Sequence, residues 1–202
     1  MDNRQRIIEE AALLFRTYGI RAVTMDMLAN QMGISKRTIY ELFKDKDEIL
    51  SAVINWMTEK QRVVLSKILI ESENVVEALF KILDLMRDHF MNMSPAFLMD
   101  IKKYRHKMMS NTDEKSEMHF FGFNEEVVRR GIKEGVFRED IDVTIINMCL
   151  FEVSKMSNDM KSIPADDLQR KDVIRNVYIN YLRGISTKKG LDLISYYEKQ
   201  KS

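Results

Sequence analysis

Cationic and hydroxyl-bearing side chains gather between Ser35 and Lys46, at a spacing that suits contact with an extended anion. If a helix begins after Ser35, five of these side chains face outward: Lys36, Arg37, Thr38, Tyr40 and Lys44. Lysine and arginine neutralise phosphates, and arginine also donates two hydrogen bonds to a guanine edge. Hydroxyl groups donate to phosphate oxygens. The residue types therefore predict a surface that contacts duplex DNA.

Two helices joined by a sharp turn would present these side chains together. Thr24 and Ser35 are residue types that cap helix N-termini, because their hydroxyls accept a hydrogen bond from a free backbone N–H. The first helix is predicted over Met25–Met32. Gly33 ends it, because the reversal of the chain needs a residue that tolerates a positive φ. The stretch is therefore a predicted helix-turn-helix.

The inward-facing residues support this interpretation. Ala29 and Met32 share one face of the first helix, and Ile39 and Phe43 share one face of the second. A residue as small as alanine lets two helices cross at close range. The order alanine, glycine, isoleucine at Ala29, Gly33 and Ile39 is typical of helix-turn-helix units that read DNA.

A further helix is predicted to start directly after this unit. Asp45 and Glu48 form an acidic variant of the capping box. Lys46 lies in the first turn, where its own charge and the helix dipole both favour an anion such as phosphate. The candidate DNA-binding residues are therefore Thr24, Ser35, Lys36, Arg37, Thr38, Tyr40, Lys44 and Lys46.

The first fifty or so residues resemble the TetR (tetracycline-repressor-like) family of bacterial transcription regulators. The resemblance rests on Ile7, Ala11, Ala12, Leu14, Phe15, Tyr18, Gly19, Thr24, Gly33, Ile34, Ser35, Thr38, Ile39, Tyr40, Phe43 and Lys46. It implies an N-terminal three-helix DNA-binding domain over residues 1–46 and a C-terminal helical ligand-binding and dimerisation domain over residues 47–202. Tyr40 resembles the phosphate-contacting tyrosine of the family.

Two residues depart from the family pattern. Met32 replaces the usual small residue before the turn glycine, and Asp45 replaces the usual serine ahead of the lysine. Neither change removes a group that bears function. The larger Met32 side chain bears on how closely the two helices approach.

Composition predicts an all-α protein. The 202 residues include only seven glycines and two prolines, and apolar residues recur near the helical period almost everywhere.

The net charge is +1, and residues 1–46 carry eight Lys or Arg against six Asp or Glu. Such a small positive excess predicts limited non-specific DNA affinity in one protomer, so binding would profit from dimerisation.

The sequence carries no signal for export or for a membrane. No N-terminal apolar run has the length of a signal peptide, and no stretch approaches the roughly 20 apolar residues of a membrane span. The single cysteine, Cys149, fits a reducing compartment. Because it lies in an apolar run, it is expected to be a small core residue. We expect a soluble cytoplasmic protein.

Apolar stripes predict the remaining helices. One covers Asn3–Tyr18, and its Arg4 and Arg6 either reach the DNA backbone or are simply solvated. A long helix follows Lys46. Further helices are expected at 74–92, from Pro95 to 108, at 118–132, 141–160 and 168–185, and near 191–197.

The helices at 141–160 and 168–185 are apolar over more than one face. One face can serve the core of the protomer, and the other then needs a partner. Pairing with the same helices of a second copy would give a four-helix dimer interface. The alternative is a deeply buried hairpin inside one chain.

The rest of the chain is rich in methionine and aromatic residues, which suit an adaptable pocket for a small apolar or aromatic molecule. The candidates are Met86, Phe90, Phe97, Tyr104, Met108, Phe120, Phe123, Met148 and Phe151. The same residues at helical spacing also describe an ordinary core. The family resemblance favours the pocket.

No residues have the spacing of a catalytic or metal site. The three histidines, His89, His106 and His119, are isolated from one another, and there is no glycine-rich phosphate loop. No cofactor or metal is expected, and the chain is not predicted to be an enzyme.

The sequence as a whole predicts a dimeric repressor that a small apolar or aromatic molecule releases from a palindromic operator. Two alternatives stay open. One is a DNA-binding regulator that is ligand-independent or controlled by a protein partner, with a C-terminal domain that only dimerises. The other is an enzyme with an appended DNA-binding head.

Overall fold

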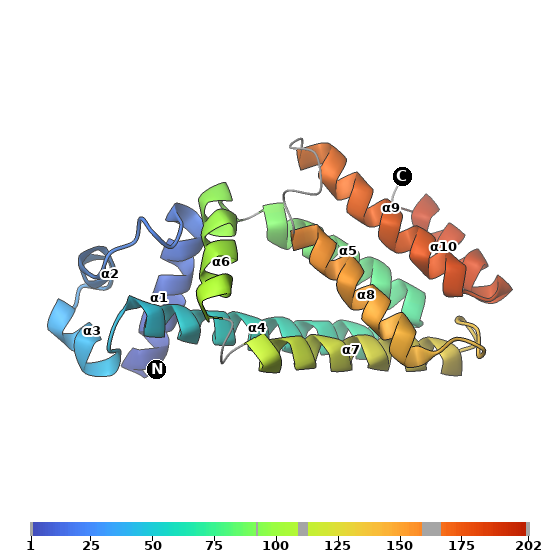
Figure 1. Ribbon diagram of the computed structural model, residues 1–202, viewed down its shortest axis with the longest axis horizontal. Helices are drawn as coiled ribbons and strands as arrows, with labels where there is room; N and C mark the ends of the chain where they lie inside the picture. Colours follow the sequence, from blue (N-terminus) through green and yellow to red (C-terminus); the bar gives the residue numbers. More distant parts are fainter. Residues whose placement is uncertain (1, 92, 109–112, 159–166, 201–202) are drawn as a thin grey trace. The chain divides into compact units, whose positions relative to one another are not determined.

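The computed structural model describes residues 2–91, 93–108, 113–158 and 167–200; the side chains of 87, 89–91, 102, 105–108, 113–121, 151–158 and 167–174 lie outside the description. Within these ranges every regular element is a helix (Figure 1). The helices are α1 Asn3–Tyr18, α2 Met25–Met32, α3 Lys36–Leu42, α4 Lys46–Glu71, α5 Val75–Met91, α6 Pro95–Met108, α7 Asp113–Lys133, α8 Val143–Asn158, α9 Asp167–Ile185 and α10 Lys188–Lys199. The prediction of an all-α fold is confirmed.

The chain forms two compact units. The first contains residues 1–63 and 88–116, and the second contains residues 64–87 and 117–202. The first unit thus includes the beginning of α4 and all of α6 as well as the predicted DNA-binding segment. The functional division between residues 46 and 47 stays a prediction.

The core of the first unit joins the N-terminal helices to α4 and α6. Ile7, Ala11 and Phe15 of α1 are buried in it together with Ile49 of α4 and Phe97 of α6. α6 packs against α1 (Figure 1). The helix-turn-helix therefore rests on a continuous apolar base rather than on its own few buried residues.

The second unit closes its core where the α7–α8 connection meets the end of α9. Gly135 ends α7 with φ of +67°, and Val136 and Phe137 then turn inward and are fully buried. Phe137 pairs with Ser186 in an isolated antiparallel bridge. Thr187, the N-cap of α10, donates its hydroxyl to the Gly135 carbonyl at 2.7 Å.

Arg130 and Glu134 of α7 clamp the corner between α4 and α5. The Arg130 guanidinium donates to the carbonyls of Leu69 and Ser72, the latter at 2.8 Å. Glu134 accepts a hydrogen bond from the Val75 backbone N–H at 2.7 Å. The arginine satisfies one carbonyl in the last turn of α4 and one just after it, and the glutamate satisfies a free N–H at the start of α5, so the pair stabilises both helix ends.

α8 and α9 pack against each other and keep apolar side chains on their outer surfaces. Leu150 of α8 and Leu182 of α9 are buried, whereas Ile145 and Met148 are 58% and 55% exposed. Cys149 is also exposed, so the expectation that it is a core residue is wrong for the single chain. Its position in an apolar run reflected the two apolar faces of α8, and Cys149 lies on the outer one.

Candidate nucleic-acid interface

Local capping sets the geometry of the pair α2 and α3. The Thr24 hydroxyl accepts a hydrogen bond from the Met27 N–H at 3.1 Å, and the Ser35 hydroxyl accepts one from the Thr38 N–H at 3.1 Å. Gly33 adopts the left-handed conformation with φ of +64°. Both caps and the glycine turn are as the sequence predicts, because each depends on residues within four positions of it.

Close packing holds the two helices together from beneath. Ala29, Ile39 and Phe43 are buried. Met32 is only partly buried and packs at the edge of the same cluster, so its bulk does not force the helices apart. The start of α4 carries the predicted acidic cap, in which Asp45 accepts from the Glu48 N–H at 2.9 Å.

The outer face of α3 is polar and open to solvent. Lys36, Arg37 and Tyr40 are exposed, as is Lys44 just after the helix, whereas Thr38 is half-buried. The side chain of Arg37 is 89% exposed. A capped helix pair with an exposed cationic and hydroxyl-bearing second helix defines a helix-turn-helix DNA-binding protein.

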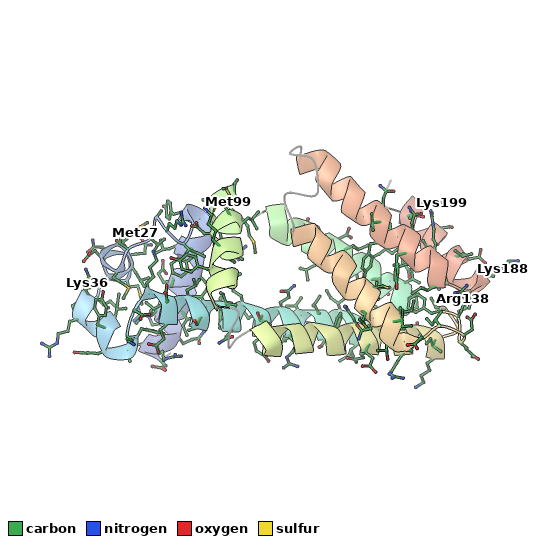
Figure 2. The ribbon with its side chains drawn as sticks, in the orientation of Figure 1. Met27, Lys36, Met99, Arg138, Lys188 and Lys199 are labelled. Carbon is green, nitrogen blue, oxygen red and sulfur yellow. The ribbon has the colours of Figure 1, made fainter. Side chains whose placement is uncertain are left out.

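Two of these cations form ion pairs within the chain. Lys36 Nζ lies 2.8 Å from Asp26 Oδ2 of α2, on the side of α3 that faces α2 (Figure 2). The hydrogen bond to Asp26 raises the pKa of Lys36. Arg37 Nε lies 3.2 Å from Glu41 Oε1 one turn along α3. Such exposed pairs are weak, so a phosphate can replace either carboxylate at little cost.

Lys46 is oriented differently from the other candidates. Its Nζ donates to the carbonyl of Val23 and, at 3.5 Å, to that of Arg21. Burial lowers its pKa, and the nearby charges of Asp100 and Asp47 act against that shift. In this structure the ammonium group holds the segment before α2. A phosphate contact by its remaining N–H donor stays a prediction.

Arg4 and the residues that sequence reasoning missed extend the site. The Arg4 guanidinium stacks over the ring of Phe43, 4.7 Å from its centroid, so this side chain is engaged at the end of α3. Asp26 was not recognised as the partner of Lys36, nor Asp100 as the partner of Arg21. For the first pair, the sequence shows only that Asp26 is an acidic residue in the first turn of α2, which does not indicate which cation it pairs with.

The candidate ligand-binding residues fall in different parts of the chain. Phe97 and Tyr104 pack on the core of the first unit, whereas Met86 and Phe123 are partly buried residues of the second, and Met148 is exposed. Four others lie outside the residues whose side chains are described: Phe90, Met108, Phe120 and Phe151. The three histidines lie outside them too. Among the described residues, no group of three or more His, Cys, Asp or Glu could hold a metal ion.

Known proteins share both the helix-turn-helix and the fold. Residues 7–53 match the family described as "Bacterial regulatory proteins, tetR family". The uncharacterized HTH-type transcriptional regulator YhgD of Bacillus subtilis (strain 168) is 25% identical over 191 residues, which cover 92% of this chain and 98% of that protein.

Two solved structures extend the likeness along most of the chain. A TetR-family transcriptional regulator from Pectobacterium atrosepticum has a TM-score of 0.74 at 18% identity, covering 92% of this chain and 94% of its own. A protein from Saccharomonospora viridis, solved in complex with choline, has a TM-score of 0.71 at 19% identity, covering 92% and 98%. Residues 7–53 thus carry the DNA-binding segment of the TetR family, and the chain as a whole is similar to TetR-family transcriptional regulators. No helix within the described residues is long and apolar enough to cross a bilayer.

Proposed function

We propose that the protein is a dimeric cytoplasmic repressor that binds a palindromic operator and leaves it when a small apolar or aromatic molecule binds its C-terminal region. The proposed DNA contact rests on the exposure of the outer face of α3. Arg37 and Tyr40 project from it into solvent, on a helix fixed by the Ser35 cap below them. A helix so placed enters a major groove, where arginine discriminates between bases.

Dimerisation would strengthen DNA binding, because one protomer has little positive charge of its own. The DNA-binding segment 1–46 has an excess of only two positive charges, which gives weak electrostatic attraction to DNA. Ile145 and Met148 of α8 and Val177 of α9 are exposed apolar side chains, which suit contact with a second copy. A two-fold dimer would place two α3 helices on half-sites one helical turn or more apart.

The proposed effector follows from side-chain chemistry and from the fold. Methionine and aromatic residues adapt to apolar and flat molecules. The choline complex of the Saccharomonospora viridis protein supports the view that this fold accommodates a small molecule. An effector would release DNA only to the extent that it binds the non-binding conformation more tightly.

The test is selection of DNA from a random-sequence and a genomic library with the purified full-length protein. We expect an inverted repeat to be enriched and to bind more tightly than unrelated DNA at the same salt concentration. Titration of the selected operator complex with a panel of apolar and aromatic compounds should then identify one that weakens binding. If no compound does, the regulator that is ligand-independent or controlled by a protein partner replaces the proposal; if no sequence is enriched, the proposal is wrong as a whole.

A further inference from the structure

A buried carboxylate joins α6 to the segment between α1 and α2. Asp100 of α6 is only 8% exposed. Its Oδ2 accepts a hydrogen bond from the Arg21 backbone N–H at 2.9 Å, and its Oδ1 lies 3.4 Å from Arg21 Nε. The two residues are 79 positions apart in the sequence. All of these atoms belong to the first unit.

α6 also packs directly against the same segment. Gly19 ends α1 with φ of +87°, and a Cβ there would lie 2.9 Å from Ala96 Cβ and 3.2 Å from Asp100 Oδ2. The Ser94 N–H donates to the Arg16 carbonyl at 3.1 Å. Such close packing leaves no room for a side chain at Gly19, so the chain after α1 contacts the backbone and the small Ala96 side chain of α6 directly.

Lys46 holds the segment from the start of α4. Its ammonium group donates to the carbonyls of Arg21 and Val23, while Asp100 binds the N–H of Arg21. The next residue, Thr24, is the N-cap of α2. The backbone that leads into the helix-turn-helix is thus fixed by one anionic group from α6 and one cationic group from α4.

We propose that Asp100 is a positioning residue for operator binding, and that it sets the placement of α2 and α3 by holding the Arg21 backbone. This inference rests on the proposed operator binding. A buried carboxylate is costly unless charged or hydrogen-bonding partners surround it, and this one has a backbone N–H and a guanidinium within reach. The apolar core beneath α1, α2 and α3 does not depend on Asp100, so its loss is expected to change where the helix pair lies more than whether it folds.

The proposal is tested with Asp100→Ala, Asp100→Asn and Arg21→Ala in the full-length protein, with Met99→Ala as the control. Met99 is an exposed neighbour on α6 (Figure 2). Affinity for the selected operator and for unrelated DNA is measured across salt concentrations. The Arg21 amide proton is followed by NMR as a readout that does not depend on DNA.

Asp100→Ala is expected to lower operator affinity about tenfold, which is the scale of a lost hydrogen bond to a charged group. Affinity for unrelated DNA should change little, as should the salt slope, meaning the slope of log affinity against log salt concentration. It should also expose the Arg21 amide to exchange. Asp100→Asn should recover part of both, because its side-chain carbonyl still accepts from that N–H. Arg21→Ala keeps the N–H and should retain most of the operator affinity.

Several results would overturn the proposal while operator binding by the wild type stands. Wild-type affinity in Asp100→Ala is one, and equal loss in Asp100→Asn and Asp100→Ala is another. A salt slope that falls by about one in Arg21→Ala would identify Arg21 as a phosphate contact instead. If the wild type selects no sequence, it is the proposed function that fails, yet the amide exchange of Arg21 in the Asp100 variants still decides whether the contact positions the backbone.

Discussion

The cations of α3 are partly neutralised before any DNA is present. Asp26 pairs with Lys36, and Glu41 pairs with Arg37. Because both pairs are exposed, they cost little to break, and they orient the two side chains in the free protein. Phosphate contact and base contact then differ in their consequences, since only base contacts distinguish sequences.

Replacing Arg37 and Tyr40 together with alanine is expected to remove sequence-selective binding. The operator affinity should fall by at least about tenfold, because a charged and a hydroxyl donor are lost, and the slope of log affinity against log salt concentration should fall by roughly one, because one positive charge is removed. Arg129→Ala is the matched control: Arg129 is also an exposed arginine paired with a glutamate one turn away, but on α7. Quantitative gel-shift titrations measure both quantities. Selective binding that survives in the double variant would contradict the assignment of α3 as the reading helix.

Tyr178 of α9 makes folding sensitive to alkaline pH. Burial raises its pKa from 10 to about 12, so the folded protein retains a proton that the unfolded chain releases above pH 10. Stability from this group is therefore complete below pH 10 and is lost as the pH rises towards 12. Relative to Tyr178→Phe, the wild type should lose about 1–2 kcal/mol of unfolding free energy over that range. Urea titrations at fixed protein concentration measure it, with the exposed Tyr196→Phe as control; equal pH profiles would refute the effect.

At the scale of the helices, two glycines of α7 have opposite surroundings. A Cβ at Gly131 would lie 2.1 Å from the Phe137 ring, whereas nothing lies within 4 Å of one at Gly122. Phe137 is fully buried where the chain turns back from α7. Glycine at position 131 thus permits the close approach of this ring, although glycine is a poor helix former.

Alanine at each position should therefore have opposite effects. Gly122→Ala is expected to stabilise the protein by about 0.5–1 kcal/mol, the helix propensity gain, and Gly131→Ala to destabilise it by about 1–3 kcal/mol through overpacking. Chemical denaturation of the two variants side by side measures the difference. A stabilising Gly131→Ala would show that the Phe137 ring moves aside without cost.

At the scale of the whole molecule, the proposed dimer contact rests on exposed apolar side chains of α8 and α9, namely Ile145, Met148 and Val177. Met148→Asp would place a charge on this surface and is expected to turn a dimer into a monomer at micromolar concentration, with operator affinity falling accordingly. Ile70→Asp is the control, because Ile70 of α4 is 78% exposed and outside both helices. Sedimentation velocity measures the mass. A wild type that is monomeric, or a Met148→Asp variant that stays dimeric, would exclude this interface.

Local patterns along the chain were enough to predict the helices and the helix-turn-helix. Thr24, Gly33 and Ser35 act on backbone groups within a few residues, and the apolar periodicity of α1 and α2 identified their buried faces. Such local signals are complete within one helix, so their positions could be predicted from the sequence.

The contacts that these residues make with other helices could not be predicted in this way, because they depend on the three-dimensional packing. In the folded chain the Lys46 ammonium group donates to the Val23 carbonyl, Phe97 is buried in the core of the first unit and Cys149 is exposed. Asp100 accepts a hydrogen bond from the Arg21 backbone N–H. A helical pattern shows that a face is apolar but not what covers it, and a charge shows no partner. Both depend on how distant helices pack, and that packing brings together residues that no spacing along the chain relates.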